Sequence, residues 1–499
     1  MDIFQLLYEG FLSALSFENL LAAAIGALLG TVVGILPGLG ASATIAIMIP
    51  VAFTMPAESG LIMMIAVYYG AMYGASTTAI LLKMPGAPSA VVSTLDGYPL
   101  AQQGKAGPAI SITAIGSFYG SIISLLGVMF LTIPLSTFAL RFGPVEYTSV
   151  MVFALLMAAT LIGSSILKGL FSIGIGVAIS LIGMDLQTGV SRFTLGIDHL
   201  LSGIDMIVVI IGIFGIGEVF YYLVTQRKGG KSGERLALRG SLIPSKKDFK
   251  ESIPPFFRGS IIGFLSGLLP GSGSTIASFL SYSTEKRLSK TPERFGKGAM
   301  QGLASVDTAN NASVGGALVP MFSLGIPGSG TTAVLLGALM MYGVSPGPSF
   351  IVNEAELFWT IVASAFLANI VLIILNLPLI PLFVKVLDIP TKYLMPIVLV
   401  IAFTGCYSLN GSITDIWLVF VFGIIGFFMR VGGLSPALFV LAIVLGVDFE
   451  RYFRQALITA SGDLTVFITS PISLILLLVA TTVVTLDIVK TYRQKRKVS

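Results

Sequence analysis

Long apolar stretches separated by short polar breaks run along almost the whole chain. The apolar stretches cover residues 19–54, 60–82, 107–135, 145–183, 203–225, 259–282, 299–345, 357–385, 393–429, 434–447 and 464–489. A helix of about 20 apolar residues spans the hydrocarbon core of a bilayer. Several stretches are too long for one span, so we expect about 12 membrane-entering segments at that length per span. The pattern predicts an all-α polytopic membrane protein.

The composition supports this fold class. Of 499 residues, 55% are hydrophobic and 11% are charged, and the mean hydropathy is +0.95. A soluble domain carries about 25% charged residues, so these values exclude a soluble enzyme, a nucleic-acid-binding protein and a disordered scaffold. Residues 1–82 contain no Lys or Arg, whereas a secretory signal begins with a basic region. We therefore expect no cleaved leader.

The basic residues indicate an orientation. They gather in 226–258, which holds nine Lys and Arg against three acidic residues, in 285–297, and in the C-terminal tail after 489. The positive-inside rule places all three segments in the cytoplasm. A basic patch for anionic lipids, the alternative reading, lies on the same side.

The two halves of the chain share an unusual motif. Residues 26–40 read GALLGTVVGILPGLG and residues 259–273 read GSIIGFLSGLLPGSG, which match at seven positions with an offset of 233. A second match pairs the Pro-Gly of 85–86 with that of 327–328, at an offset of 242. Glycines four residues apart allow close helix packing. The LPG-x-G sequences interrupt helices, and broken helices in a membrane occur only inside protein or beside a wet cavity.

These breaks predict re-entrant hairpins in an inverted repeat. The segment 259–284 has cytoplasmic flanks and one span's length, which indicates a helix in, a turn and a helix back. Its counterpart at 26–54 has acidic flanks, so it enters from the outside, and such repeats place a binding site near the midplane. We divide the chain into an N-terminal membrane repeat (1–225), a basic cytoplasmic linker (226–258), a C-terminal membrane repeat (259–463), and an extra helix with a basic cytoplasmic tail (464–499).

The most polar intramembrane stretch is VDTANNASVGGALVP, 306–320. A carboxylate inside a membrane indicates function by default, and the oxygen-rich residues after it suit Na⁺, with unwound backbone carbonyls completing the site. The predicted cation ligands are Asp307, Thr308, Asn310, Asn311 and Ser313. The alternative is that Asp307 only caps a helix starting near 308.

Hydroxyl-rich sequences follow each helix break. A helix that starts after a break presents free N–H groups and a positive dipole end, which bind anions. The predicted substrate-binding residues are Gly38, Gly40, Ser42, Ser76, Thr77, Gly271, Ser272, Gly273, Ser274, Thr275, Gly328, Ser329, Thr331 and Thr332. The alternative for each hydroxyl is a hydrogen bond back to its own helix.

Other candidate chemistry is sparse. Lys83 could neutralise an anionic substrate, but snorkelling to the interface is the favoured reading, and His199 suits a surface loop better than a proton relay. The chain has one histidine and one cysteine, Cys406, which exclude a histidine-rich metal cluster and an internal disulfide. No G-x-x-x-x-G-K-[ST] motif occurs, so we expect no ATP site and no cofactor. Energy then comes from an ion gradient, with Na⁺ as one coupling ion, or from another subunit.

Four motifs together resemble the large membrane subunit of tripartite tricarboxylate transporters. They are GILPGLGASATIAIMIP (34–50), YGAMYGASTTAILLKMPGAPS (69–89), GLLPGSGSTIASFLSYSTEKRLSK (267–290) and DTANNASVGGALVPMFSLGIPGSGTTAVLLG (307–337). The resemblance covers nearly the whole chain. Lys83 departs from it, because a small or neutral residue is more usual at that position.

The resemblance implies a secondary transporter in a bacterial cytoplasmic membrane. It implies two partners, a small membrane subunit and a periplasmic solute-binding protein that delivers citrate or a related carboxylate, with coupling to Na⁺ or protons. An elevator-like motion of the hairpins is an expectation by analogy. The alternatives are a stand-alone transporter for an ion or small organic anion, a membrane scaffold or membrane-embedded enzyme, and a pore.

Overall fold

The protein is helical, as its apolar pattern predicts. The computed structural model describes all of the chain except residues 1–2, 37–39, 84–85, 163–164, 186–187, 227–241, 272, 380, 383–384, 386–390 and 499. Within the described part, one two-stranded antiparallel hairpin is the only sheet. Most of the predicted linker, 227–241, lies outside the described residues. Its last part is helical, because α11 begins at Lys246.

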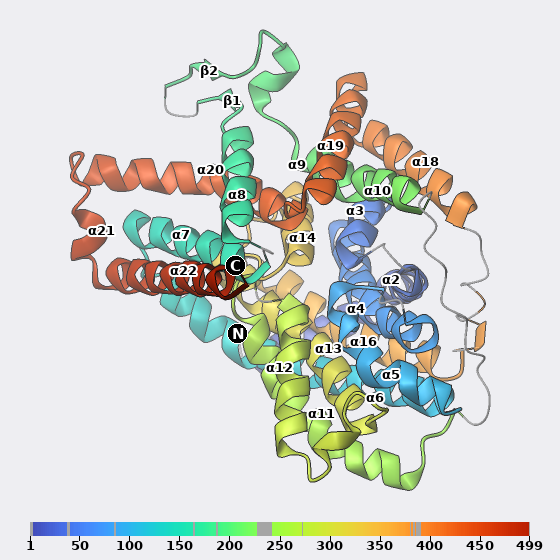
Figure 1. Cartoon of the computed structure of the whole chain (residues 1–499). Coiled ribbons are helices and arrows are strands. Elements are labelled where there is room, and N and C mark those ends of the chain that lie inside the picture. The colour runs from blue at the N-terminus through green and yellow to red at the C-terminus, as the bar shows by residue number, and fades with distance from the viewer. Residues whose placement is uncertain are drawn as a thin grey trace.

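The helices follow one another in three groups (Figure 1). The first group contains α1 (Ile3–Ala14), α2 (Phe17–Ile35), α3 (Ala41–Ala52), α4 (Ala57–Leu82), η1 (Pro88–Val91), α5 (Ser93–Gln102) and α6 (Ala106–Ala139). The second contains α7 (Pro144–Ile162), α8 (Ile166–Ser180), β1 (Gly183–Met184), β2 (Ser191–Arg192), η2 (Asp198–Ser202), α9 (Met206–Ile210), η3 (Ile211–Ile216) and α10 (Gly217–Gln226). The third contains α11 (Lys246–Gly267), α12 (Gly273–Leu288), η4 (Pro292–Arg294), α13 (Met300–Leu324), α14 (Gly330–Met341), α15 (Pro348–Asn353), α16 (Ala355–Asn376), α18 (Thr391–Asn410), α19 (Ile413–Gly432), α20 (Pro436–Thr459), α21 (Val466–Thr469) and α22 (Pro471–Val498).

The chain reverses direction between α11 and α12. The Ser281 hydroxyl of α12 donates to the carbonyl oxygen of Ser305 at 3.0 Å, and Gly259 of α11 packs against the same carbonyl. Arg258 and Glu285 face each other across the pair, with Nε and Oε1 2.6 Å apart. The two helices therefore form a hairpin with its tip at the LPGSG sequence, and both lie along α13.

A similar reversal occurs between α2 and α3. Near the start of α2, the Asn19 side chain accepts a hydrogen bond from Ser59 at 2.6 Å. At the end of α3, the Ala52 carbonyl lies beside Gly60. Both ends of this hairpin thus lie at the start of α4, and its two helices are separated by residues 36–40, most of which lie outside the described residues.

The glycine ladders are the contact surfaces of these hairpins. A Cβ atom at any of the six ladder glycines would lie within 3.0 Å of a backbone carbonyl oxygen of the facing helix. The glycines of α2 are Gly26, Gly30 and Gly34, and they face the carbonyls of Met63, Val67 and Ala71 in α4. The glycines of α11 are Gly259, Gly263 and Gly267, and they face Ser305, Ala309 and Ser313 in α13. Only hydrogen fits at these positions, so the backbones touch directly.

The centre of the molecule is built from helices that are apolar around their whole circumference. In α4, 94% of the most apolar 18-residue segment is buried. Helix α13 is buried from Met300 to Ser323 apart from one position. Among the described residues, seven helices are long and apolar enough to cross a membrane: Phe17–Ile35, Ala57–Leu82, Ala106–Ala139, Met206–Val224, Ala355–Asn376, Ile413–Gly432 and Pro471–Val489. The expected total of about 12 membrane-entering segments stays a prediction.

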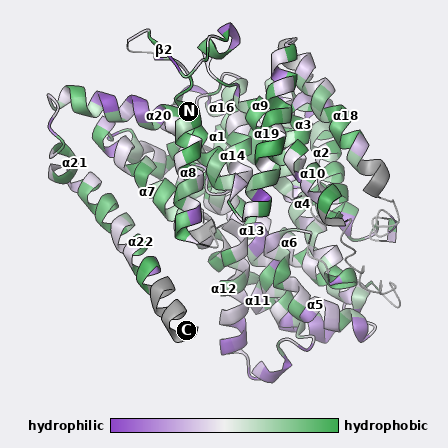
Figure 2. Ribbon diagram, turned by 45° about the horizontal axis from the view of Figure 1, so that its top comes forward, coloured by the Kyte–Doolittle hydropathy of each residue, from purple (hydrophilic) through white to green (hydrophobic). Residues whose placement is uncertain are grey.

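Helix α22 lies at the margin of the molecule. It packs mainly on α7, and only 11% of its apolar segment within Pro471–Val489 is buried. Figure 2 shows it running along one side of the helical body, with hydrophilic residues gathered at the outer ends of α11 and α12. An apolar helix with so little protein cover has the surface expected of a segment facing lipid.

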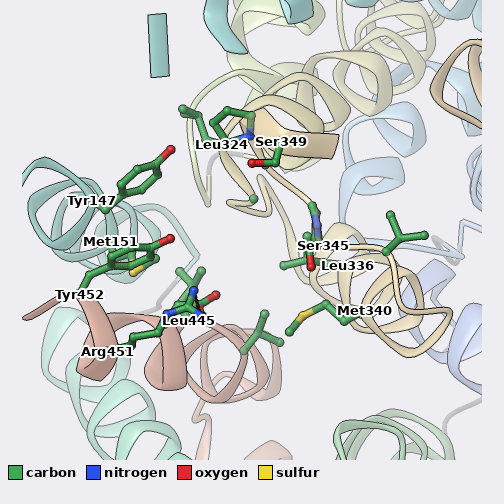
Figure 3. A pocket seen from close by; sticks show the side chains of 17 residues that line it. Tyr147, Met151, Leu324, Leu336, Met340, Ser345, Ser349, Leu445, Arg451 and Tyr452 are labelled. Atoms are coloured by element: carbon green, nitrogen blue, oxygen red, sulfur yellow. Dashed lines mark ion pairs between the residues drawn. The ribbon is translucent and has the colours of Figure 1, made fainter. Parts of the chain in front are cut away.

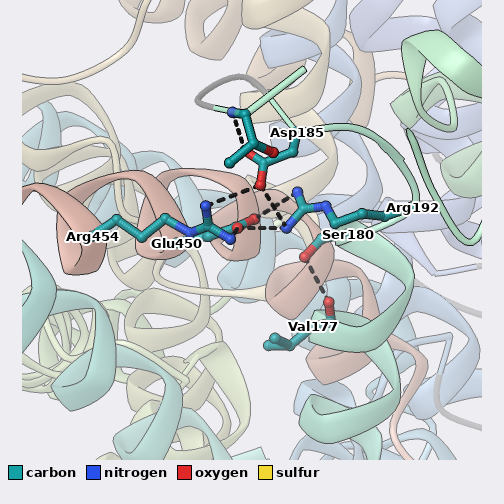
Figure 4. A network of polar contacts seen from close by, with 7 residues as sticks. Val177, Ser180, Asp185, Arg192, Glu450 and Arg454 are labelled. Atoms are coloured by element: carbon teal, nitrogen blue, oxygen red, sulfur yellow. Dashed lines mark hydrogen bonds and ion pairs between the residues drawn. The ribbon is translucent and has the colours of Figure 1, made fainter. Parts of the chain in front are cut away.

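A small lobe containing β1, β2 and η2 stands between α8 and α9. Arg192 of β2 donates to both carboxylate oxygens of Glu450 in α20, at 2.7 and 3.2 Å, and Arg454 donates to Asp185 at 3.0 Å (Figure 4). These hydrogen bonds to the Glu450 carboxylate raise the pKa of Arg192 above its ordinary value. His199 of η2 lies 2.6 Å from Asp415 at the start of α19. The network fixes the lobe to two helices.

Candidate functional site

Side chains from three separate helices meet at the N-terminus of α14. The Ser42 hydroxyl of α3 lies 2.9 Å from the Thr331 hydroxyl of α14, and the Tyr68 hydroxyl of α4 lies 3.4 Å from that of Ser329. We call Ser42, Tyr68, Ser329, Thr331 and Thr332 the hydroxyl cluster. It brings together four predicted substrate residues that lie as much as 290 positions apart, and it adds Tyr68.

The start of α14 explains the local geometry. Ser329 is the N-cap, and its hydroxyl and that of Thr332 form a capping box with the backbone N–H groups of the two residues. The Ser329 N–H donates to Thr332 Oγ1 at 2.8 Å, and the Thr332 N–H donates to Ser329 Oγ at 3.2 Å. The cap therefore engages two of the backbone N–H groups that we expected to be available to an anion.

The glycines of the breaks have structural roles. Gly271 and Gly273 have φ of +79° and +52°, which glycine adopts easily. The Gly271 N–H donates to the Gly328 carbonyl at 2.9 Å, which joins the α11–α12 tip to the break before α14. Gly40 is the N-cap of α3, and Gly273, Ser274 and Thr275 form the first turn of α12. Two predicted substrate residues, Gly38 and Ser272, lie outside the described residues.

Asp307 lies in a second, fully buried polar group. Its carboxylate accepts a short hydrogen bond from Ser76 of α4 and contacts of 3.4 Å from the Ser93 hydroxyl of α5. Its exposed fraction is 0%, and within the described part of the chain no basic side chain forms a salt bridge with it. Ser76, predicted as a substrate ligand, thus lies with the predicted cation residue. We call Ser76, Ser93 and Asp307 the carboxylate cluster.

Two expectations about this stretch are wrong. Asp307 is not a helix cap, because it lies eight residues inside α13, whose N-cap is Ala299. The backbone from 306 to 316 is also not unwound, since α13 is continuous from Met300 to Leu324. Close cover by α6 and α11 keeps the polar segment helical. Its carbonyls are therefore engaged in helix hydrogen bonds, and ligands have to come from side chains.

The remaining predicted cation residues divide by partner. Thr308 and Ser313 donate back to carbonyls of their own helix, at 2.8 and 2.7 Å. Asn311 donates to Ser117 of α6 at 2.7 Å. Asn310 has a hydrogen-bond partner for neither of its amide atoms among the described residues, although it is 1% exposed. Asn310 is therefore free to bind a ligand through its whole amide group, and Oδ1 of Asn311 also has no partner among the described residues.

Lys83 and Thr77 also lie on α4. Thr77 is buried inside the helix. Lys83 ends the helix as a left-handed C-cap with φ 56°, and its ammonium lies 5.7 Å from the Tyr98 ring. The side chain is exposed, and it contacts neither the hydroxyl cluster nor the carboxylate cluster, which agrees with the snorkelling interpretation.

Sequence reasoning missed Tyr68, Ser93 and Ser117. The repeat offers one signal for Tyr68, because at an offset of 242 it corresponds to Asn310, a predicted cation ligand. Ser93 and Ser117 lie in ordinary helical sequence, where no local pattern distinguishes them.

A cavity of about 410 Å³ opens between α7, α14 and α20. Figure 3 shows Tyr147 and Tyr452 on one side of it and Ser345, Leu336 and Met340 opposite. The two tyrosine rings stack with centroids 4.8 Å apart, and Gly325, at the break before α14, also lines the space. The cavity reaches the helix whose N-terminus carries the hydroxyl cluster.

The two clusters offer different binding chemistry. The described residues contain no group of three or more His, Cys, Asp or Glu side chains that could hold a metal ion together. Hydroxyls and a helix N-terminus offer hydrogen-bond donors to an anion, whereas the carboxylate cluster offers negative charge and oxygen ligands to a cation.

Comparisons with known proteins agree with this reading. The sequence profile described as tripartite tricarboxylate transporter TctA family matches residues 20–441. A 52.8 kDa protein of Agrobacterium vitis, described as uncharacterized and located in the TAR-I ttuC′ 3′ region, is 42% identical over 496 residues, covering 99% of this chain and 98% of the relative. A protein of the TAR-II ttuC′ 3′ region of the same organism is 44% identical over 234 residues, covering 47% of this chain and 97% of the relative. No solved structure matches the chain.

The family match and the apolar helices describe the same kind of molecule. The family consists of membrane transporter subunits that work with other subunits, and the helices fit a multi-pass membrane protein. The resemblance found in the four sequence motifs is therefore confirmed. The chain belongs to the tripartite tricarboxylate transporter TctA family.

Proposed function

We propose that this chain is the substrate-translocating subunit of a binding-protein-dependent secondary transporter that imports citrate or a related carboxylate. The observation that carries the proposal is the hydroxyl cluster. Ser42 and Thr331 lie 2.9 Å apart although they are far apart in the sequence, and both lie in the first turn of a helix that follows a break. Two positive helix ends with hydroxyl donors suit the carboxylates of an organic acid.

The proposed architecture is an inverted repeat of hairpin plus long helix. It is supported by the registers of the glycine contacts. Adding 233 to the residue numbers of the α2 glycines gives those of the α11 glycines, and adding 242 to the numbers of their contact residues in α4 gives the contact residues in α13. The same offsets relate the contact of Gly86 with the Gly34 carbonyl to that of Gly328 with the Gly267 carbonyl. Such repeats place the binding site between them.

The proposed setting is a bacterial cytoplasmic membrane, with the linker and the C-terminus in the cytoplasm. The basic residues of 226–258 and of the tail support this orientation. The proposed partners are the small membrane subunit and a periplasmic solute-binding protein, which the family description supports through the word tripartite.

The proposed coupling ion is Na⁺ or H⁺, and its site includes Asp307. Support comes from the complete burial of this carboxylate among hydroxyls of α4 and α5. A buried charge without a basic partner is costly. A bound cation or a proton removes that cost, so ion binding and the state of the site are linked.

Uptake measurements test the proposal. Labelled citrate uptake is compared in cells that lack their own citrate carriers and that make this chain alone or with both partners, with and without Na⁺. Uptake that needs all three proteins supports the proposal, whereas uptake by the chain alone supports a stand-alone transporter. Absence of uptake from the complete system for citrate and for a panel of tri- and dicarboxylates would refute it.

A pair of variants ties uptake to the hydroxyl cluster. Thr331→Val removes the hydroxyl at nearly constant volume, and Thr331→Ser keeps it. We expect at least a tenfold loss of transport rate at low substrate for the first and near wild-type uptake for the second. Equal activities of the two variants would remove this hydroxyl from the substrate site.

A further inference from the structure

Seven side chains outside the hydroxyl cluster have a buried polar atom without a hydrogen-bond partner among the described residues: Tyr69, Ser89, Ser121, Arg192, Ser278, Asn310 and Asn311. Three of them lie on elements that pack on one another: Ser89 of η1, Ser278 of α12 and Asn310 of α13. Their exposed fractions are 1%, 0% and 1%. Buried polar groups are nearly always hydrogen-bonded, so three unpartnered oxygen atoms on these three neighbouring elements need an explanation.

The helix geometry of α13 directs Asn310 between η1 and α12. Asp307, three residues earlier, meets Ser93 of α5. Val306, four residues earlier, belongs to one apolar cluster with Val92 and Tyr282 of α12. Residues three and four apart share a face of a helix. Asn310 therefore lies one turn beyond a point where α13 contacts both neighbours.

Ser278 lies one helical turn before Tyr282 on α12. Ser89 lies in η1, which ends at Val91, just before Val92 of the same apolar cluster. Because α12 runs antiparallel to α13, the step from Tyr282 to Ser278 follows the step from Val306 to Asn310. Helices α12 and α13 both pack on η1. The three unpartnered side chains thus lie on three elements that pack on one another.

The repeat offsets relate this place to the hydroxyl cluster. An offset of 242 converts Tyr68 to Asn310, and it converts Ser89 to Thr331. An offset of 233 converts Ser42 to Thr275, in the first turn of α12. In the hydroxyl cluster these counterparts lie within hydrogen-bond distance of one another or of Ser329. The two places are therefore related, but their side chains differ in chemistry.

We infer that Ser89, Ser278 and Asn310 form a site for a dehydrated monovalent metal cation, with Na⁺ as the expected occupant. Two hydroxyls and an amide oxygen are hard oxygen ligands without charge. Asp307, one turn away, supplies a negative charge that attracts a cation and repels a carboxylate. This inference rests on the cation coupling proposed above. The sequence placed all cation ligands on the segment that forms α13, whereas this site also takes ligands from η1 and α12.

Thermal unfolding of the purified full-length chain in detergent tests the site without substrate or partner proteins. The melting temperature is measured against NaCl, with choline chloride keeping the ionic strength constant. A cation that binds only the folded state raises the melting temperature in a saturable way. We expect such a rise for the wild type and for Ser260→Ala, a control in which the lost buried hydroxyl is bonded to its own helix at 2.7 Å.

The variants Ser89→Ala, Ser278→Ala and Asn310→Ala are expected to need at least tenfold more Na⁺ for the same rise. Ser89→Thr, which keeps the hydroxyl, is expected to retain the response, and it provides the comparison if an alanine variant melts too early. An unchanged Na⁺ response in all three alanine variants would overturn the site, and absence of any response in the wild type would do the same. Failure of citrate uptake with an intact Na⁺ response would refute the proposed substrate and leave this site standing.

Discussion

The C-caps of α4 and α13 make a strong test of the backbone geometry. Lys83 and Gly325 occupy corresponding positions at an offset of 242, and both are left-handed, with φ of 56° and 71°. A left-handed conformation costs a residue with a side chain about 1–2 kcal/mol, whereas glycine adopts it freely. Lys83→Gly is therefore expected to relieve strain that Gly325 never carries.

The magnitude follows from two opposing terms. The Lys83 ammonium lies 5.7 Å from the Tyr98 ring, and such an exposed cation–π contact contributes about 0.5–1 kcal/mol. Lys83→Gly loses this contact and the strain together, and Lys83→Gln loses the contact alone. The glycine variant is expected to be more stable than the glutamine variant by about 1 kcal/mol, after allowance for the greater freedom of glycine in the unfolded chain.

The assay is the melting temperature of both variants in detergent, where this difference corresponds to a shift on the order of 1–2 °C for a chain of this length. Gly325→Ala supplies the converse, because a Cβ there would lie 2.9 Å from the Pro346 carbonyl oxygen. It should melt lower than the wild type. A glycine variant no more stable than the glutamine variant would refute the strain argument. Loss of uptake in both would mean that the Lys83 charge serves the substrate.

Three further changes probe other contacts. Gly263→Leu forces a side chain against the Ala309 carbonyl and should prevent stable folding, as judged by size-exclusion chromatography, whereas Gly174→Leu on α8, where the added Cβ meets nothing within 4 Å, should fold normally. Glu285→Gln breaks the pair with Arg258 across the α11–α12 hairpin and should lower the free energy of unfolding by about 2 kcal/mol, seen as a lower melting temperature. The control is Lys286→Gln at the exposed neighbouring residue, which should melt like the wild type. Equal melting temperatures of the two variants would contradict the role of the pair. Asp307→Asn should abolish ion-coupled uptake with little change in melting temperature, and wild-type uptake would remove this carboxylate from the coupling site.

The hairpins could be predicted because they depend on local sequence. Glycine at every fourth position, followed by LPG-x-G, predicts a close-packed helix and then a break, and the structure has both. The positions follow from residue type alone, because Pro and Gly limit helix formation wherever they occur.

The composition of the site could not be predicted to the same depth. Ser42 meets Thr331 through packing that no local pattern encodes, and Tyr68 resembles any apolar residue of α4 until its partner is known. The alternative interpretation of Asp307 as a helix cap failed for a related reason. Capping is a local rule, but the burial of α13 against α6 and α11 continues the helix through a sequence that would otherwise favour its start.

Asp96 restricts how the two halves can move. Its carboxylate accepts hydrogen bonds from the backbone N–H groups of Gly296, Gly298 and Ala299, each at 2.8 Å, and from the Tyr282 hydroxyl at 2.9 Å. One side chain of α5 thereby holds the last residues of the connection between α12 and α13. A transport cycle that shifts the second hairpin either breaks four hydrogen bonds at this joint or carries α5 with it. If the four hydrogen bonds persist, α5 moves together with the second hairpin although it belongs to the N-terminal half of the chain.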